Sequence, residues 1–304
     1  MALNKQTLQT RSLTALIFVV VMLSGLLINE WSFFILFSII HFGCWYEYFK
    51  IIGLIHPAYQ NISGFHKFAV MFAGFGFMLF CTSSKLHIAN VPLKTIGYGL
   101  IVLFATAFPF IEIVFNKKKN IRLVFYSLLG LVYISVSWSL LVDMRGFFSF
   151  SSFKYLKNLD ISLVYILILI ASIWINDTMA YIVGSVIGKT PLSSISPKKT
   201  WEGTIGGIIL CIVVVGFVLA PWFFSESFSE NLFARYRVIA MCIAAIAAIV
   251  GTFGDLLESK LKRLANVKDS GSFMPGHGGF LDRFDSLILA TPFVWLFLKI
   301  VLKA

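Results

Sequence analysis

Apolar runs recur along the whole chain, and they constrain its fold more than any other feature. As a helix, a run of about 20 such residues spans the hydrocarbon core of a bilayer. The mean hydropathy is +0.89, and 59% of the residues are hydrophobic, which argues against a pair of soluble domains. The sequence predicts an all-α polytopic membrane protein with about nine transmembrane helices, near residues 12–28, 32–55, 65–81, 93–115, 121–142, 161–187, 203–224, 236–257 and 284–302.

Basic residues predict the orientation of these helices, because cytoplasmic flanks carry an excess of Lys and Arg. If the N-terminus is cytoplasmic, 16 of the 25 basic residues lie on the cytoplasmic side. We therefore expect the C-terminus outside, and the polar loops 188–203 and 258–283 in the cytoplasm. We treat residues 1–304 as one integral membrane domain, with N-terminal helices over about 12–142 and a catalytic C-terminal part over about 161–302. The net charge of +11 fits this topology and anionic lipid head groups, with no nucleic acid as partner.

Two further features fit a membrane protein without metal-binding cysteines. The first apolar run follows Lys5 and Arg11, but no small-x-small cleavage site follows it, so we expect a retained helix. The four cysteines form no CxxC pair and lie in or beside apolar runs, so we interpret them as buried structural thiols; they are Cys44, Cys81, Cys211 and Cys242.

Asp177 lies inside the sixth apolar run, in the stretch WINDTMAYIVG. An ionised Asp near a helix centre costs about 2.5–3.5 kcal/mol on insertion. Such residues usually face a cavity or a partner and indicate function. Tyr181, four residues on, shares a helical face with Asp177. A structural ion pair with a distant Lys or Arg is the alternative.

The stretch SPKKTWEGTIGG carries Lys198 and Lys199 at the mouth of the seventh run. Lys is a good point-charge ligand for phosphate. The glycines at 203, 206 and 207 allow a backbone or a ligand to approach closely. An ordinary positive flank is the alternative, and the stretch is not a P-loop.

The stretch GDLLESKLKR places acidic and basic residues on one helical face at the inner end of the eighth run. The spacing i, i+3, i+4 and i+7 puts them in one stripe, formed by Asp255, Glu258, Ser259 and Lys262. A water-exposed amphipathic helix end is the alternative, although Asp255 directly follows an apolar run.

The stretch KDSGSFMPGHGGFLDRFDS precedes the last apolar run. Asp282 and Asp285 share a face by their i, i+3 spacing. Glycines on both sides of His277 predict a tight loop, and Lys268 and Arg283 are candidate phosphate ligands. Helix capping explains each acid alone, but it requires neither His277 nor the glycines.

Together these motifs predict a metal-dependent, phosphate-handling site at a membrane face. Asp255, Asp282 and Asp285 lie near the cytoplasmic ends of two helices, and Asp177 joins them if a cavity reaches inward. Carboxylates that converge repel one another unless a cation joins them, and oxygen ligands of this kind suit Mg²⁺ together with substrate phosphates.

One set of residues resembles the signature of phosphatidate cytidylyltransferases, also called CDP-diacylglycerol synthases. The set runs from Ser259 through Lys262–Arg263, Lys268–Asp269, Pro275, His277–Gly278–Gly279 and Asp282–Arg283–x–Asp285. NDTMAYIVG and SPKKTWEG resemble further motifs of that family. The resemblance covers roughly residues 165–300, and Met274 is a conservative departure from it.

The resemblance implies that CTP and phosphatidic acid react to give CDP-diacylglycerol and pyrophosphate. It implies Mg²⁺, with K⁺ as an optional second cation, and metal ligands at Asp177, Asp255, Asp282 and Asp285. It implies catalytic roles for five residues, which are Asp282, Asp285, Lys262, Arg263 and His277. It implies that five further residues bind the substrates, which are Lys198, Lys199, Ser259, Lys268 and Arg283. His277 either donates to a phosphate or only shapes its loop.

Other functions stay open on the sequence alone. A cation transporter would explain Asp177 and the glycine-rich breaks, but it does not call for so many basic residues beside the acids. A CTP-dependent enzyme on another lipid, such as a polyprenol kinase or an archaeal-lipid cytidylyltransferase, is a nearer rival. A structural membrane subunit would tolerate Ala at the acids. We expect a bacterial inner membrane with the site facing the cytoplasm, and a homodimer is left open.

Overall fold

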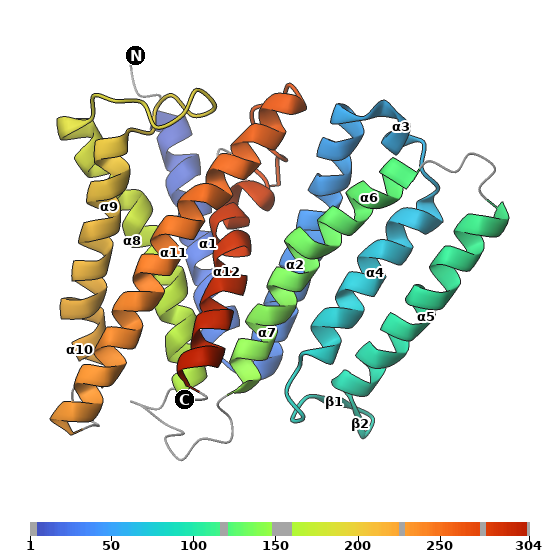
Figure 1. The fold of residues 1–304 in the computed structure, drawn as a ribbon, viewed down its shortest axis with the longest axis horizontal. Helices are drawn as coiled ribbons and strands as arrows, with labels where there is room; N and C mark the ends of the chain where they lie inside the picture. Colours follow the sequence, from blue (N-terminus) through green and yellow to red (C-terminus); the bar gives the residue numbers. More distant parts are fainter. Residues whose placement is uncertain (1–4, 116–120, 148–159, 225–228, 274–277, 303–304) are drawn as a thin grey trace. The chain divides into compact units, whose positions relative to one another are not determined.

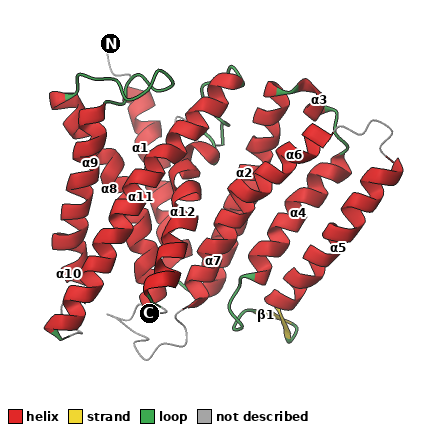
Figure 2. Cartoon of the chain, in the orientation of Figure 1, coloured by secondary structure: helices red, strands yellow, loops and turns green. Residues whose placement is uncertain are grey.

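The computed structural model describes residues 5–115, 121–147, 160–224, 229–273 and 278–302, with the side chains of 5–12, 108–115, 121 and 147 left out. Within these residues the chain is almost entirely helical (Figure 2). Two strands, β1 (His87–Ile88) and β2 (Val91–Pro92), pair antiparallel in a short hairpin, with Ile88 opposite Val91. The prediction of an all-α protein is therefore confirmed.

A helix lies at every predicted span, as Figure 1 shows in order along the chain. The N-terminal helices are α1 (Lys5–Leu27), α2 (Glu30–Ile55), α3 (Pro57–Gln60), α4 (Gly64–Phe80), α5 (Leu93–Phe115), α6 (Ile121–Gly130), the π-helical η1 (Leu131–Val136) and α7 (Ser137–Phe147). The C-terminal helices are α8 (Ile161–Ile187), α9 (Trp201–Val214), the π-helical η2 (Val215–Leu219), α10 (Ala220–Phe224), α11 (Glu230–Leu264) and α12 (Leu281–Val301).

Six helical segments of the described chain are long and apolar enough to cross a bilayer. They are Glu30–Ile55, Arg122–Gly146, Ile161–Ile187, Trp201–Phe224, Glu230–Leu264 and Leu281–Val301. Shorter apolar helices cover Leu13–Leu27, Gly64–Phe80 and Leu93–Ala107. The chain is an integral membrane protein; nine spans and the orientation of the termini stay predictions.

Local sequence signals start several of these helices. Asn29 and Ser32 form a reciprocal capping box before α2, Ser63 caps α4, Asp160 caps α8 and Thr200 caps α9. Each cap satisfies a backbone N–H that has no partner inside its helix. The eighth predicted span is longer than expected, because α11 continues through Leu264 and makes the first residues of the predicted loop 258–283 helical.

The described chain divides into two compact units. The first contains Met1–Asp143 and Leu261–Phe284, and the second contains Met144–Lys260 and Asp285–Ala304. The expectation of a single membrane domain stays a prediction. Each unit therefore combines segments that are distant in the sequence.

The first unit has an aromatic core with buried polar links. The ring of Phe37 packs on Trp138, with centroids 5.2 Å apart. The indole N–H of Trp45 donates to Ser135 Oγ at 2.9 Å, and a ring nitrogen of His41 lies 3.0 Å from the same oxygen. These links pair polar groups that would otherwise be costly to bury in a membrane protein.

The second unit contains the tight packing of α8 against α9. A Cβ added at Gly207 would lie 2.8 Å from Ala180 Cβ, and one at Gly203 would lie 2.7 Å from the Ala180 carbonyl oxygen. The prediction that these glycines admit a close approach is confirmed, since the backbone of α8 is what approaches. The interpretation of the cysteines as buried thiols holds for Cys44 and Cys211, whereas Cys81 and Cys242 are half-buried.

Candidate active site

Three carboxylates converge in the second unit. Asp255 and Glu258 are one turn apart on α11, and Asp285 comes from α12; one oxygen of each lies within 4.8 Å of the others. Glu258 is fully buried, Asp285 is 8% exposed and Asp255 is half-buried. Acidic groups this close repel one another when ionised. The cluster therefore has the donor set that a hard divalent cation takes.

Close contact between α11 and α12 brings these acids together. A Cβ added at Gly254 would lie 2.6 Å from the carbonyl oxygen of Asp285 and 3.0 Å from Ser286 Cα. Only glycine fits a contact of this kind between two backbones. The Asp285 Oδ1 atom also accepts the Ser286 N–H at 2.6 Å. The glycine directly before Asp255 thus sets the approach of Asp285.

Lys199 and Asp177 extend this cluster within the second unit. The Lys199 ammonium forms an ion pair with the Asp255 carboxylate. Asp177 on α8 lies close enough to both Lys199 and Asp255 to interact with them electrostatically. The structure therefore brings four sequence-predicted residues, Asp177, Lys199, Asp255 and Asp285, into one unit, together with Glu258.

Hydrogen bonds hold the loop that carries Lys199. The Leu192 N–H donates to the Lys199 carbonyl at 2.7 Å, and the Trp201 N–H donates to the Thr190 carbonyl at 3.0 Å. The Thr200 hydroxyl accepts the Gly203 N–H at 3.1 Å and caps α9. Lys199 is thereby held directly before the start of α9, whereas the neighbouring Lys198 is exposed.

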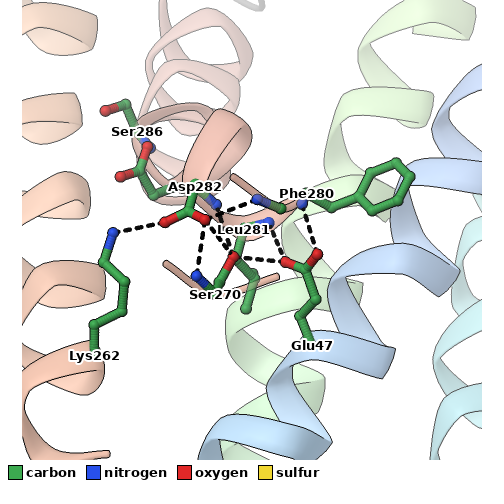
Figure 3. A network of polar contacts seen from close by, with 9 residues as sticks. Glu47, Lys262, Ser270, Phe280, Leu281, Asp282 and Ser286 are labelled. Atoms are coloured by element: carbon green, nitrogen blue, oxygen red, sulfur yellow. Dashed lines mark hydrogen bonds and ion pairs between the residues drawn. The ribbon is translucent and has the colours of Figure 1, made fainter. Parts of the chain in front are cut away.

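Asp282 is the centre of a second polar network, in the first unit (Figure 3). Its Oδ1 atom accepts from Lys262 Nζ at 2.6 Å. Its Oδ2 atom accepts from the Ser270 N–H and the Gly279 N–H, each at 2.8 Å, and it also lies 2.8 Å from the Ser270 hydroxyl oxygen. Lys262 and Asp282 are thus paired, which the sequence analysis did not predict, and this network ties α12 to the preceding loop.

Glu47 on α2 completes this network, and the sequence analysis missed it. Its two oxygens accept the Phe280 and Leu281 N–H groups, each at 2.9 Å, and Oε2 also accepts from the Ser270 hydroxyl at 2.7 Å. Glu47 is 3% exposed. The sequence feature that could have identified Glu47 is an acidic residue within the apolar stretch GCWYEYFK.

Several other predicted site residues lie in the same two units. Arg263, Lys268 and Arg283 are exposed in the first unit, and Ser259 is half-buried in the second. His277 lies outside the described residues, as do Met274 and Pro275. Asp282 is grouped with Lys262 and Ser270, while the described three-carboxylate cluster contains Asp255, Glu258 and Asp285.

The chain is similar in sequence to a protein family and to several known proteins. Residues 9–301 match a model described as the cytidylyltransferase family. A phosphatidate cytidylyltransferase of Bacillus subtilis is 36% identical over 230 residues, which cover 71% of this chain and 81% of that protein.

Two further relatives are shorter matches. The chloroplastic phosphatidate cytidylyltransferase 4 of Arabidopsis thaliana is 43% identical over 143 residues, 47% of this chain and 34% of that protein. A phosphatidate cytidylyltransferase of Synechocystis is 37% identical over 161 residues, 53% of this chain and 52% of that protein. The matched part thus spans 34% and 52% of the length of these two relatives.

Proposed function

The chain belongs to the cytidylyltransferase family, and we propose that it transfers the cytidylyl group of CTP to phosphatidate. A phosphate oxygen of phosphatidate attacks the α-phosphorus of CTP. The bond from that phosphorus to the oxygen bridging to the β-phosphate breaks, and pyrophosphate leaves. The products are CDP-diacylglycerol and pyrophosphate. The names of relatives that share 36–43% identity with the chain support this pair of substrates.

The convergence of Asp255, Glu258 and Asp285 beside Lys199 is the observation that carries the proposal. The attacking phosphate is already an anion, so the reaction requires no strong general base. Its main barrier is the repulsion between two anions that must come together. Cations that neutralise and align the phosphates lower such a barrier.

The basic residues have matching proposed roles. In the second unit, Lys199 is held by its ion pair with Asp255 and would bind a phosphate oxygen as a point charge, with exposed Lys198 beside it. In the first unit, Lys262, Arg263, Lys268 and Arg283 are proposed phosphate ligands. His277 remains a candidate donor to the leaving pyrophosphate.

Mg²⁺ fits the donor set of the second unit. Asp255, Glu258 and Asp285 would hold it, since their oxygens are close enough to one another to share one ion. When bound, Mg²⁺ supplies positive charge to the phosphate oxygens of the substrate. We propose K⁺ as an optional second cation, and we keep Asp177 and Asp282 as further candidate ligands.

We also propose a location in a bacterial inner membrane with the reactive groups on the cytoplasmic side. The distribution of Lys and Arg supports this orientation. CTP is a cytoplasmic compound, and phosphatidate would present its head group at the same interface.

A labelling assay tests the reaction. The purified chain in detergent receives phosphatidate, Mg²⁺ and CTP labelled at its α-phosphate, and label in extracted lipid is measured. We expect lipid product from the parent protein, and a rate about 100-fold or more lower for Asp285→Asn, because one oxygen ligand loses its charge. Glu30→Gln is the matched control, since Glu30 pairs with Lys85 at 3.0 Å and lies outside the cluster.

Two outcomes would contradict parts of the proposal. If Asp285→Asn retains the parent rate, the cation assignment fails while the reaction stands. If the parent protein labels no lipid in an assay where the Bacillus subtilis relative does, the choice of substrates fails.

A further inference from the structure

A cavity of about 620 Å³ lies in the first unit, against α2 and α4. Its volume falls in the range of about 300–1,000 Å³ that is common for small-molecule sites. Most of the wall is aromatic or aliphatic, formed by Phe42, Tyr46, Phe49, Leu54, Phe68 and Met71. The cavity contains none of the residues assigned above to the transfer reaction.

Two lysines, Lys50 and Lys67, give this apolar cavity a positive end. None of the described residues that line it is acidic. Lys67 Nζ donates to the Gln60 carbonyl at 3.2 Å, and the Gln60 side chain donates to the Gly53 carbonyl at 3.1 Å. Gln60 therefore links the end of α2 to the start of α4 and positions Lys67, while Lys50 is exposed.

The lysines lie near one end of the two helices, and part of the apolar wall lies farther along them. Lys50 is five residues before the end of α2, and Lys67 is three residues after the start of α4. Phe42 is eight residues before Lys50, which is about 12 Å along a helix axis. The wall therefore extends from the charged end of the helices toward their apolar middle.

The apolar wall is supported from behind by ring packing. Phe42 packs on Phe75 with centroids 5.0 Å apart, and Phe49 packs on Trp45 at the same centroid distance. On the open side, Tyr46 is 73% exposed and Phe68 is 58% exposed. The cavity thus combines a fixed apolar floor with an open mouth.

From this arrangement we infer that the cavity binds one anionic phospholipid from the surrounding bilayer. The lipid phosphate lies between Lys50 and Lys67, and an acyl chain follows the aromatic wall toward the membrane interior. A basic pair above an apolar trough matches a lipid with a negative head group, and a zwitterionic lipid gains less from it. This inference does not depend on the transfer reaction.

Lipid binding can be measured by native mass spectrometry of the purified full chain, without CTP. The chain is titrated with phosphatidylglycerol, phosphatidate and phosphatidylcholine. We expect the double variant Lys50→Gln, Lys67→Gln to bind the anionic lipids about tenfold or more weakly, and phosphatidylcholine as the parent does. Lys94→Gln is the control, because exposed Lys94 on α5 is outside the cavity. It removes one positive charge, as each of the single variants Lys50→Gln and Lys67→Gln does, and it is compared with those.

A second pair of variants tests the apolar part without changing charge. Gly64 lines the cavity, and a Cβ added there meets only Phe68, at 4.0 Å. Gly64→Leu should therefore fold and should weaken binding of the anionic lipids. At Gly99 an added Cβ meets nothing within 4 Å, so Gly99→Leu is the matched control outside the cavity.

The binding results distinguish three occupants of the cavity: bulk anionic phospholipid, phosphatidate, and a second copy of the chain. Binding of both anionic lipids supports a site for bulk anionic phospholipid, and binding of phosphatidate alone supports a site that collects the substrate. Unchanged binding in both the double variant and Gly64→Leu overturns the inference. It is also overturned if these variants only convert a dimer to a monomer, because the cavity then receives a second copy of the chain.

Discussion

At the scale of single residues, Ser270 links two buried carboxylates. Its hydroxyl oxygen lies 2.7 Å from Glu47 Oε2 and 2.8 Å from Asp282 Oδ2, yet the hydroxyl has only one proton to donate. Asp282 is therefore stabilised mainly by Lys262 and by two backbone N–H groups. Charged hydrogen bonds of this kind are stronger than neutral ones.

Asp282→Asn should lower the thermal stability of the chain. The substitution removes the negative partner of Lys262, whose side chain is 15% exposed, and leaves a poorly solvated ammonium group. The cost is roughly 2–4 kcal/mol. Thermal unfolding in detergent should show a midpoint several degrees lower.

The control for this prediction is Asp269→Asn, because Asp269 is exposed in the same loop. It should unfold at the parent midpoint. Equal midpoints for both variants would show that the pair of Lys262 and Asp282 adds no stability.

At the scale of elements, α12 begins with a cap from a distant helix. The first N–H groups of a helix have no partners inside it. At α12, Glu47 of α2 accepts two of the N–H groups around the helix start, those of Phe280 and Leu281. Its negative charge also suits the positive end of the helix dipole.

Glu47→Gln should loosen the start of α12. The amide can accept one of the two N–H groups, but its NH₂ group would face the other donor. We expect faster hydrogen–deuterium exchange in a peptide covering residues 278–284, with a local loss of roughly 1–3 kcal/mol. Glu30→Gln, at the opposite end of α2, should leave that exchange unchanged.

Close packing of α11 on α12 gives a second prediction at this scale. Gly254→Leu places a side chain against the Asp285 backbone, which cannot move aside as a flexible side chain could. It should displace Asp285 from Asp255 and abolish most lipid labelling in the assay above. Gly251→Ala is the control, because its added Cβ would be 3.3 Å from Ser286 Cβ and needs only a small adjustment. Equal rates in the two variants would contradict this role of Gly254.

At the scale of the whole molecule, segments distant in sequence form each unit. Leu261–Phe284, which carries most of the signature loop, belongs with the N-terminal helices and not with the helices next to it in sequence. The sequence assigns no site residue to the N-terminal half. Glu47 shows that it also positions the loop that precedes α12.

The orientation in the membrane is a prediction that thiol labelling can test. In a variant without Cys44, Cys81, Cys211 and Cys242, a single cysteine is introduced by His87→Cys or by Thr190→Cys, both exposed positions. A membrane-impermeant reagent should label His87→Cys in intact cells, and Thr190→Cys only after permeabilisation. The reverse pattern would invert the topology inferred from Lys and Arg.

The sequence alone determined the class of the protein, the positions of its helices and most candidate site residues. Apolar runs of membrane length and buried charges are local properties, so they can be read directly along the chain. Helical spacing likewise predicted that Asp255 and Glu258 share a face.

Which of these residues meet follows from the packing of the helices. This packing grouped Asp285 with Asp255 and Glu258, paired Asp282 with Lys262, and brought in Glu47 from a helix more than 200 positions away. Contacts of this kind depend on how each helix is rotated about its axis and on how closely two helices approach each other, as at Gly254. Periodicity within one segment carries no information about either quantity, because each depends on the side chains of two segments at once.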